Sequence, residues 1–205
     1  MRGFIEAGRR LRPDAGFECK DVAGGVATFM GAASPLSQAT SIALETPVSA
    51  KDIARITDFY RDRGAPPRIS VNPLADASLE NELVRAGYAP LTRNNVLAID
   101  ASTASTTMDE RVTEELDLDA WGRASYAGFS DRYSNGDEGV FLATTIASSD
   151  GVVALAIRNG DGIVATSALL MQEDLASLIA GSTLIGHRGK GYHRAMILDR
   201  LSRAR

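Results

Sequence analysis

The sequence predicts an α+β protein in which a mixed, largely antiparallel sheet is flanked by helices, arranged as two tandem halves. Residues 152–185 hold three β-type runs in succession, and the tight turn between the first two makes these strands antiparallel. In residues 17–99, shorter β-type runs alternate with amphipathic helical segments. The Ser/Thr/Ala-rich stretch at residues 100–109 separates the two regions and has the composition of a linker.

The first half contains four candidate strands. The clearest runs are residues 26–30 and residues 40–45, which are separated by a segment with Gly and Pro. Residues 68–71 follow Pro66-Pro67 and form a short third run, and residues 88–99 form a longer fourth one. We therefore expect several short strands in this half, with helices between them.

Two helices are expected in the first half. Ser49 and Asp52 have the spacing of a capping box, which predicts a helix that begins after Ser49 and ends at Gly64. Residues 76–86 form the second helical segment, with Gly87 as its stop. One face of each helix is apolar, formed by Ile53, Ile56 and Tyr60 in the first and by Leu79, Leu83 and Ala86 in the second.

The domain organisation follows from these patterns. We expect an N-terminal half at residues 1–100, a linker at residues 101–110 and a C-terminal domain at residues 111–205. The C-terminal domain opens with a strand at residues 111–116, a helix at residues 117–130 and a polar loop at residues 131–138.

The rest of the C-terminal domain is a meander that leads into a glycine-containing loop. Asn159-Gly160-Asp161-Gly162 is a strong hairpin signal, because Asn-Gly and Asp-Gly tolerate positive φ. The expected order is strands at residues 152–158, 163–171 and 175–185, a loop at residues 186–191 and an amphipathic helix at residues 192–204.

The loop between the third strand and the last helix suits a phosphate group. A helix N-terminus carries unpaired N–H groups and a partial positive charge. Gly189 and Gly191 lack a Cβ, so an anion can approach the backbone, and Arg188 and Lys190 add positive charge. The alternative is that these glycines only form a strand-to-helix turn, with both cations solvated.

A nucleotide-binding P-loop is excluded at this place. Gly181 and Gly186 have the spacing of a Walker A motif, but the next two residues are His187 and Arg188 instead of Lys and Ser/Thr. The residues that would contact the phosphates and Mg²⁺ are therefore missing, and an ATPase or kinase is not expected.

The segment from Ala180 to Ala195 resembles motif A of the GCN5-related N-acetyltransferases (GNAT), whose signature is Arg/Gln-x-x-Gly-x-Gly/Ala at the start of a helix. Arg188 and Gly191 match the first and fourth positions, whereas His193 stands where Gly or Ala is usual. The preceding meander also matches the family, and the first half is similar to the leading half of a two-part acetyltransferase. The resemblance thus covers most of the chain.

The resemblance implies an N-acetyltransferase that moves acetyl from acetyl-CoA to a primary amine of a small molecule or peptide. By this resemblance, the backbone of Thr183 and Leu184 faces the pantetheine arm. A backbone N–H of the third strand would polarise the thioester carbonyl. The remaining expected cofactor contacts are the N–H groups of Arg188, Gly189, Lys190, Gly191, Tyr192 and His193.

The general base is not assigned by the sequence. Glu173 and Asp174 are close to the meander but have the pattern of a solvated hairpin tip, and His187 reads as a loop residue. Trp121, Tyr126 and Phe129 either line an acceptor pocket or pack in the core.

Family members continue after the motif A helix with a strand, a helix and a last strand. Residues 68–99 have such a strand-helix-strand pattern, but the second half ends within its helix at Arg205. We therefore expect a C-terminally incomplete second domain whose third strand has an open edge, which favours self-association as a homodimer. A non-catalytic GNAT-like binding or assembly module is the alternative function.

Composition limits the other classes of function. The chain has 205 residues and a net charge of −4, which argues against a general nucleic-acid binder. It has one cysteine, Cys19, which argues against a cysteine-based metal site, so no metal is expected. The first 16 residues lack the apolar core of a signal peptide. The longest uncharged apolar run, residues 175–186, is shorter than the roughly 20 residues that span a bilayer. We expect a cytoplasmic protein without membrane contacts.

Overall fold

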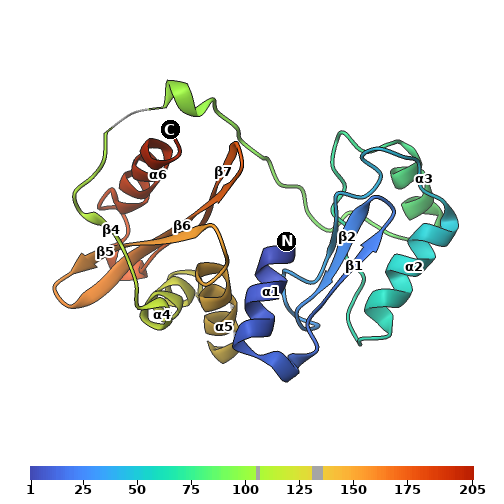
Figure 1. Ribbon diagram of the computed structural model, residues 1–205, viewed down its shortest axis with the longest axis horizontal. Helices are drawn as coiled ribbons and strands as arrows, with labels where there is room; N and C mark the ends of the chain where they lie inside the picture. Colours follow the sequence, from blue (N-terminus) through green and yellow to red (C-terminus); the bar gives the residue numbers. More distant parts are fainter. Residues whose placement is uncertain (105–106, 131–135) are drawn as a thin grey trace. The chain divides into compact units, whose positions relative to one another are not determined.

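The computed structural model describes residues 1–104, 107–130 and 136–205, which form two compact units, Met1–Asn95 and Val96–Arg205 (Figure 1). The chain is α+β, with antiparallel sheets flanked by helices, as the sequence predicts. Within the ranges described, no helix is both long and apolar enough to cross a membrane.

The first unit is built on a small three-stranded antiparallel sheet. Its strands β1 (Glu18–Val22), β2 (Gly25–Phe29) and β3 (Ala39–Thr40) lie in the order β1-β2-β3. The turn from β1 to β2 needs two left-handed residues, Ala23 and Gly24, at φ 49° and 77°. A helix that the sequence patterns did not predict, α1 (Arg2–Leu11), packs beside this sheet, where its Gly8 approaches Phe17 and Met30.

Two helices complete the first unit, α2 (Ala50–Arg61) and α3 (Ser78–Arg85). The predicted capping box is present, because the Ser49 N–H donates to Asp52 Oδ2 at 3.0 Å and the Ser49 side chain accepts from the Asp52 backbone. The apolar faces of both helices cover the sheet in one core, whose largest fully buried members are Ile42, Ile53, Ile56, Tyr60 and Leu79.

Three predicted strands of the first unit are wrong or shorter than expected. The run at residues 40–45 keeps only its first residue in β3, because Ser41 and Ala43 have positive φ and form a turn. Residues 68–71 contribute one isolated bridge between Ile69 and Ala39. Residues 88–99 form no strand: their composition is β-prone, but a strand needs a partner, and Val96 and Leu97 are more than 90% exposed.

The second unit contains a four-stranded antiparallel sheet in the order β4-β5-β6-β7. The register of the β5–β6 hairpin pairs Asn159 with Gly162 across the predicted turn. The strands are β4 (Val112–Glu114), β5 (Val152–Asn159), β6 (Gly162–Gln172) and β7 (Leu175–Thr183). In the described part of the unit β7 is therefore an edge strand, whose outer side has no neighbour in the sheet.

Helices cover both faces of this sheet (Figure 1). The helix α6 (Tyr192–Arg203) packs Ala195 and Met196 on one face, and α4 (Leu118–Phe129) and α5 (Gly136–Ala147) pack on the other. Alternate residues of β5 point to opposite sides, since Leu155 and Ile157 join the α6 core and Ala154 and Ala156 join the α4–α5 core.

Two boundaries of the second unit differ from the prediction. The predicted loop at residues 131–138 falls partly on residues 131–135, which lie outside the described residues, and α5 begins already at Gly136. The third strand ends at Thr183 instead of residue 185, because Ile185–His187 form a short 3-10 helix, η4.

Candidate functional site

The loop between β7 and α6 has an open, glycine-lined backbone. Gly189 and Gly191 have φ values of 77° and 79°, the left-handed region that disfavours side chains. Apart from the adjoining residues, no atom of the described residues lies within 4 Å of the place where a Cβ would stand on either glycine. The backbone of this loop is thus exposed on the side that a ligand would approach.

The N-terminus of α6 points its free amides into this loop. Gly191 is the residue that caps the helix, and no side chain of the described residues caps it by a hydrogen bond. The first turn is closed by the Ala195 N–H, which donates to the Gly191 carbonyl at 3.0 Å. The N–H groups of Tyr192, His193 and Arg194 therefore have no acceptor within the helix and carry its partial positive charge.

Arg188 ties the loop to two other elements. Its Nε donates to the Thr183 carbonyl at the end of β7 at 3.1 Å, and its Nη2 donates to the Gly128 carbonyl of α4 at 2.9 Å. Gly128 also lets α4 pack closely on β7, since a Cβ there would lie 2.4 Å from Ser182 Oγ. The cation thus fixes the loop beside α4 and β7, while Lys190 stays exposed.

A β-bulge interrupts β7 just before the loop. The β6–β7 register pairs Thr166 with Ser182 and Ala168 with Ile179, so Ala180 and Gly181 together face one residue of β6, Ser167. Ala180 has φ 49°, which is rare for a residue with a side chain. A bulge leaves the extra residue out of the ladder and re-aims the strand, and this one lies on an edge strand.

The side chain of His193, in α6, packs against this bulge. A Cβ on Gly181 would lie 3.3 Å from Cε1 of His193 and 3.7 Å from its Nδ1. The imidazole therefore points at the strand, and it takes room that Gly181 leaves free. The departure from Gly or Ala at position 193 is accommodated at Gly181.

Comparison with known proteins supplies one structural relative. No family model matches the chain, and no curated protein matches it. A solved structure, the GCN5-related N-acetyltransferase from Kribbella flavida, superposes on 98% of this chain and 80% of that chain, with a TM-score of 0.67 and 18% sequence identity. The chain has the GNAT fold.

Of the two residues expected to face the pantetheine arm, Thr183 is the last residue of β7 and Leu184 follows it. The N–H of Leu184 is already used, since it donates to the Val164 carbonyl of β6 at 3.0 Å. The Thr183 carbonyl accepts from Arg188, but Thr183 Oγ1 is buried with no hydrogen-bond partner among the described residues. Nδ1 of His187, in η4, is likewise buried without a partner among the described residues, so two polar atoms beside the loop are unsatisfied.

Other candidates do not meet at the bulge. Glu173 and Asp174 form the exposed turn between β6 and β7, with Glu173 at φ 48°. Trp121 is fully buried in the core, where its Nε1 donates to the Leu155 carbonyl at 3.0 Å. Tyr126 packs against Gly139 of α5, Phe129 is 42% exposed, and His187 lies in η4.

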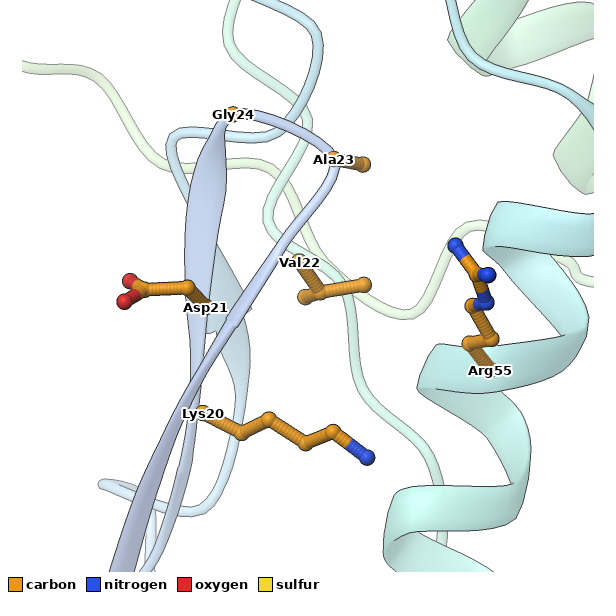
Figure 2. A pocket seen from close by; sticks show the side chains of 6 residues that line it. All are labelled: Lys20, Asp21, Val22, Ala23, Gly24 and Arg55. Carbon is orange, nitrogen blue, oxygen red and sulfur yellow. The ribbon is translucent and has the colours of Figure 1, made fainter.

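A hollow lies elsewhere, in the first unit. Figure 2 shows it between the β1–β2 hairpin and α2, with Lys20 and Val22 pointing toward α2 and Arg55 on the helix side. Both cations are exposed, and Arg55 is paired with Asp52 at 3.4 Å. The hollow therefore has the character of a solvated surface, and it contains no residue of the expected site.

Proposed function

We propose that the chain is an N-acetyltransferase that moves an acetyl group from acetyl-CoA to a primary amine of a small molecule or peptide. The observation that carries the proposal is the loop: two left-handed glycines with open space lead directly into the N-terminus of α6, which no described side chain caps. The GNAT fold around this loop supports the same assignment.

In this proposal the loop holds the pyrophosphate of CoA. Free N–H groups at the start of α6 donate to phosphate oxygens, and the helix dipole favours their negative charge. Lys190 adds a mobile cation, and Arg188 acts mainly by fixing the loop against Gly128 and Thr183. The ligand also supplies a partner for Thr183 Oγ1, which has none among the described residues.

The bulge of β7 polarises the acyl group. Negative charge develops on the thioester oxygen when an amine attacks the carbonyl carbon, and a fixed N–H donor stabilises that charge. Ala180 is outside the β6–β7 ladder, so its N–H is the donor that we assign to this oxygen. The amine gives up its proton and the thiolate takes one, so that CoA leaves as a thiol.

Titration of the chain with CoA, acetyl-CoA and ATP tests the proposal. We expect saturable binding of both CoA species and no comparable binding of ATP, because the Walker A residues are absent. A thiol-release assay with a panel of primary amines then reports transfer. Absence of CoA binding by the folded chain contradicts the proposal, and binding without transfer to any amine favours the non-catalytic module.

A further inference from the structure

Arg200 of α6 is a buried cation bonded to backbone carbonyls. Its side chain is 3% exposed, and its Nε donates to the Met196 carbonyl one turn back at 2.9 Å. Its Nη1 donates to Ala168 of β6 at 3.2 Å and to Ile179 of β7 at 3.1 Å. Burial lowers the pKa of Arg200 to about 10, so the guanidinium is still charged at neutral pH.

Burying this cation costs desolvation free energy, which suggests that the charge has a functional role. Removing a cation from water is expensive, and carbonyl dipoles compensate less well than a carboxylate. The buried carboxylate of Asp199 compensates the charge in part through space, but its hydrogen bond comes from Arg203, at 2.6 Å. The two carbonyls that Arg200 joins belong to the register pair directly before the bulge.

The bond to Ile179 fixes a peptide plane. The Ile179 carbonyl and the Ala180 N–H belong to one planar trans peptide, in which they point in opposite directions. Holding the carbonyl therefore aims the N–H of Ala180 away from the guanidinium. The same bond helps to hold Ala180 at φ 49°, a left-handed conformation that is unfavourable for a residue with a side chain.

The same face of α6 covers the whole bulge. His193 contacts Gly181, Met196 accepts from the Ser167 hydroxyl at 3.1 Å, and Arg200 contacts Ile179. These helix residues are spaced at i, i+3 and i+7, so one stripe of α6 is fitted to the distorted part of β7. Arg200 is the charged member of this stripe.

We propose that Arg200 is a positioning residue for acyl transfer: it holds the Ile179–Ala180 peptide so that the Ala180 N–H faces the thioester oxygen, and its charge strengthens that donor. The cation polarises the peptide through the carbonyl, as in a chain of hydrogen bonds. This inference rests on the proposed function, because it assigns the bulge to acetyl-CoA.

Infrared spectroscopy of bound acetyl-CoA, isotopically labelled at the acetyl carbonyl, tests the role. In the wild-type protein the carbonyl stretch should shift to lower frequency than in water. The shift should be lost in Arg200→Met and partly kept in Arg200→Lys. The Kd of both variants for CoA without the acetyl group should differ from the wild-type value by less than about threefold. An oxyanion donor is worth about 10²–10³ in kcat, so Arg200→Met should lose about 10²-fold in transfer.

Arg203→Met is the matched control on the same helix. Arg203 bonds Asp199 and reaches Glu114 on β4, at the other edge of the sheet from β7. Its loss should lower stability without changing the carbonyl frequency. An unchanged frequency in folded Arg200→Met overturns the inference alone, whereas a wild-type protein that binds no CoA overturns the proposed function.

The Ala180 amide provides a second measurement if Arg200→Met does not fold. Its NMR resonance should move downfield when acetyl-CoA replaces CoA in the wild-type protein, and it should move less in Arg200→Lys. An Ala180 amide that responds equally to both ligands in the wild-type protein also overturns the inference.

Discussion

Gly181 of β7 and His193 of α6 form a complementary pair, because a methyl group on Gly181 would lie 3.3 Å from Cε1 of His193. The GNAT motif has Gly or Ala where this chain has His193, and the missing side chain on the facing strand leaves space for the imidazole.

Gly181→Val should destabilise the protein by about 1–3 kcal/mol, the usual cost of overpacking. The cause is contact between the valine methyls and His193, so His193→Ala should recover part of the loss in the double variant. Urea denaturation of the four proteins measures this coupling. Strictly additive free energies would contradict the pairing of these two residues.

Ser49→Ala should cost about 1 kcal/mol at neutral pH through loss of the α2 capping box. The hydrogen bonds of Ser49 hold the pKa of Asp52 below its usual value, so their stabilisation is present above the unfolded pKa near 4 and is lost as the pH falls. Denaturation at pH 7 and pH 3 should therefore show a smaller effect of Ser49→Ala at pH 3. An effect that is equal at both pH values would count against this account.

Limited trypsin digestion should cut first at Arg93. Residues 89–100 contain no helix or strand, and each of them is exposed. Arg111 is a poorer target, because its side chain is bonded to Asp109 at 2.8 Å and 2.6 Å and lies over the Tyr192 ring. Mass spectrometry of the first fragments identifies the first cleavage site. A first cut at Arg111 would instead favour the linker expected at residues 101–110.

The open edge of β7 should promote self-association, a homodimer being the simplest form. Leu175 is 65% exposed at the start of this strand, and Leu175→Lys should weaken the association by placing a charge on the edge. Leu116→Lys is the control, since Leu116 is 87% exposed and lies outside the four strands. Sedimentation that shows a monomer at all concentrations would refute the prediction.

Local signals predicted much of the fold. Asn159-Gly160-Asp161-Gly162 predicted the β5–β6 hairpin because its turn chemistry is local, and Ser49 with Asp52 predicted the start of α2. The sequence does not predict helix α5, because most positions of residues 139–147 are apolar or small, which leaves no 3.6-residue periodicity. Residues 88–99 have the composition of a strand, but composition does not supply a partner.

The distinctive parts of the candidate site depend on tertiary contacts. Alanine does not favour positive φ, unlike the glycines at positions 189 and 191, so the bulge at Ala180 could not be predicted from the sequence. Arg200 has the sequence context of a solvated helix residue, and only the packing of α6 on the sheet buries it. The motif thus located the loop, and the fold supplied the residues that shape the strand before it.

Calorimetric titration of CoA into three proteins tests the central claim, that the loop from Gly189 to His193 binds the pyrophosphate. Gly191→Val places a branched side chain where the phosphate is expected, and Gly160→Val imposes a similar left-handed strain, at φ 59°, in the β5–β6 turn. We expect at least tenfold weaker CoA binding for folded Gly191→Val, about 1.4 kcal/mol, and wild-type affinity for Gly160→Val. Equal CoA affinity of all three folded proteins would contradict the account.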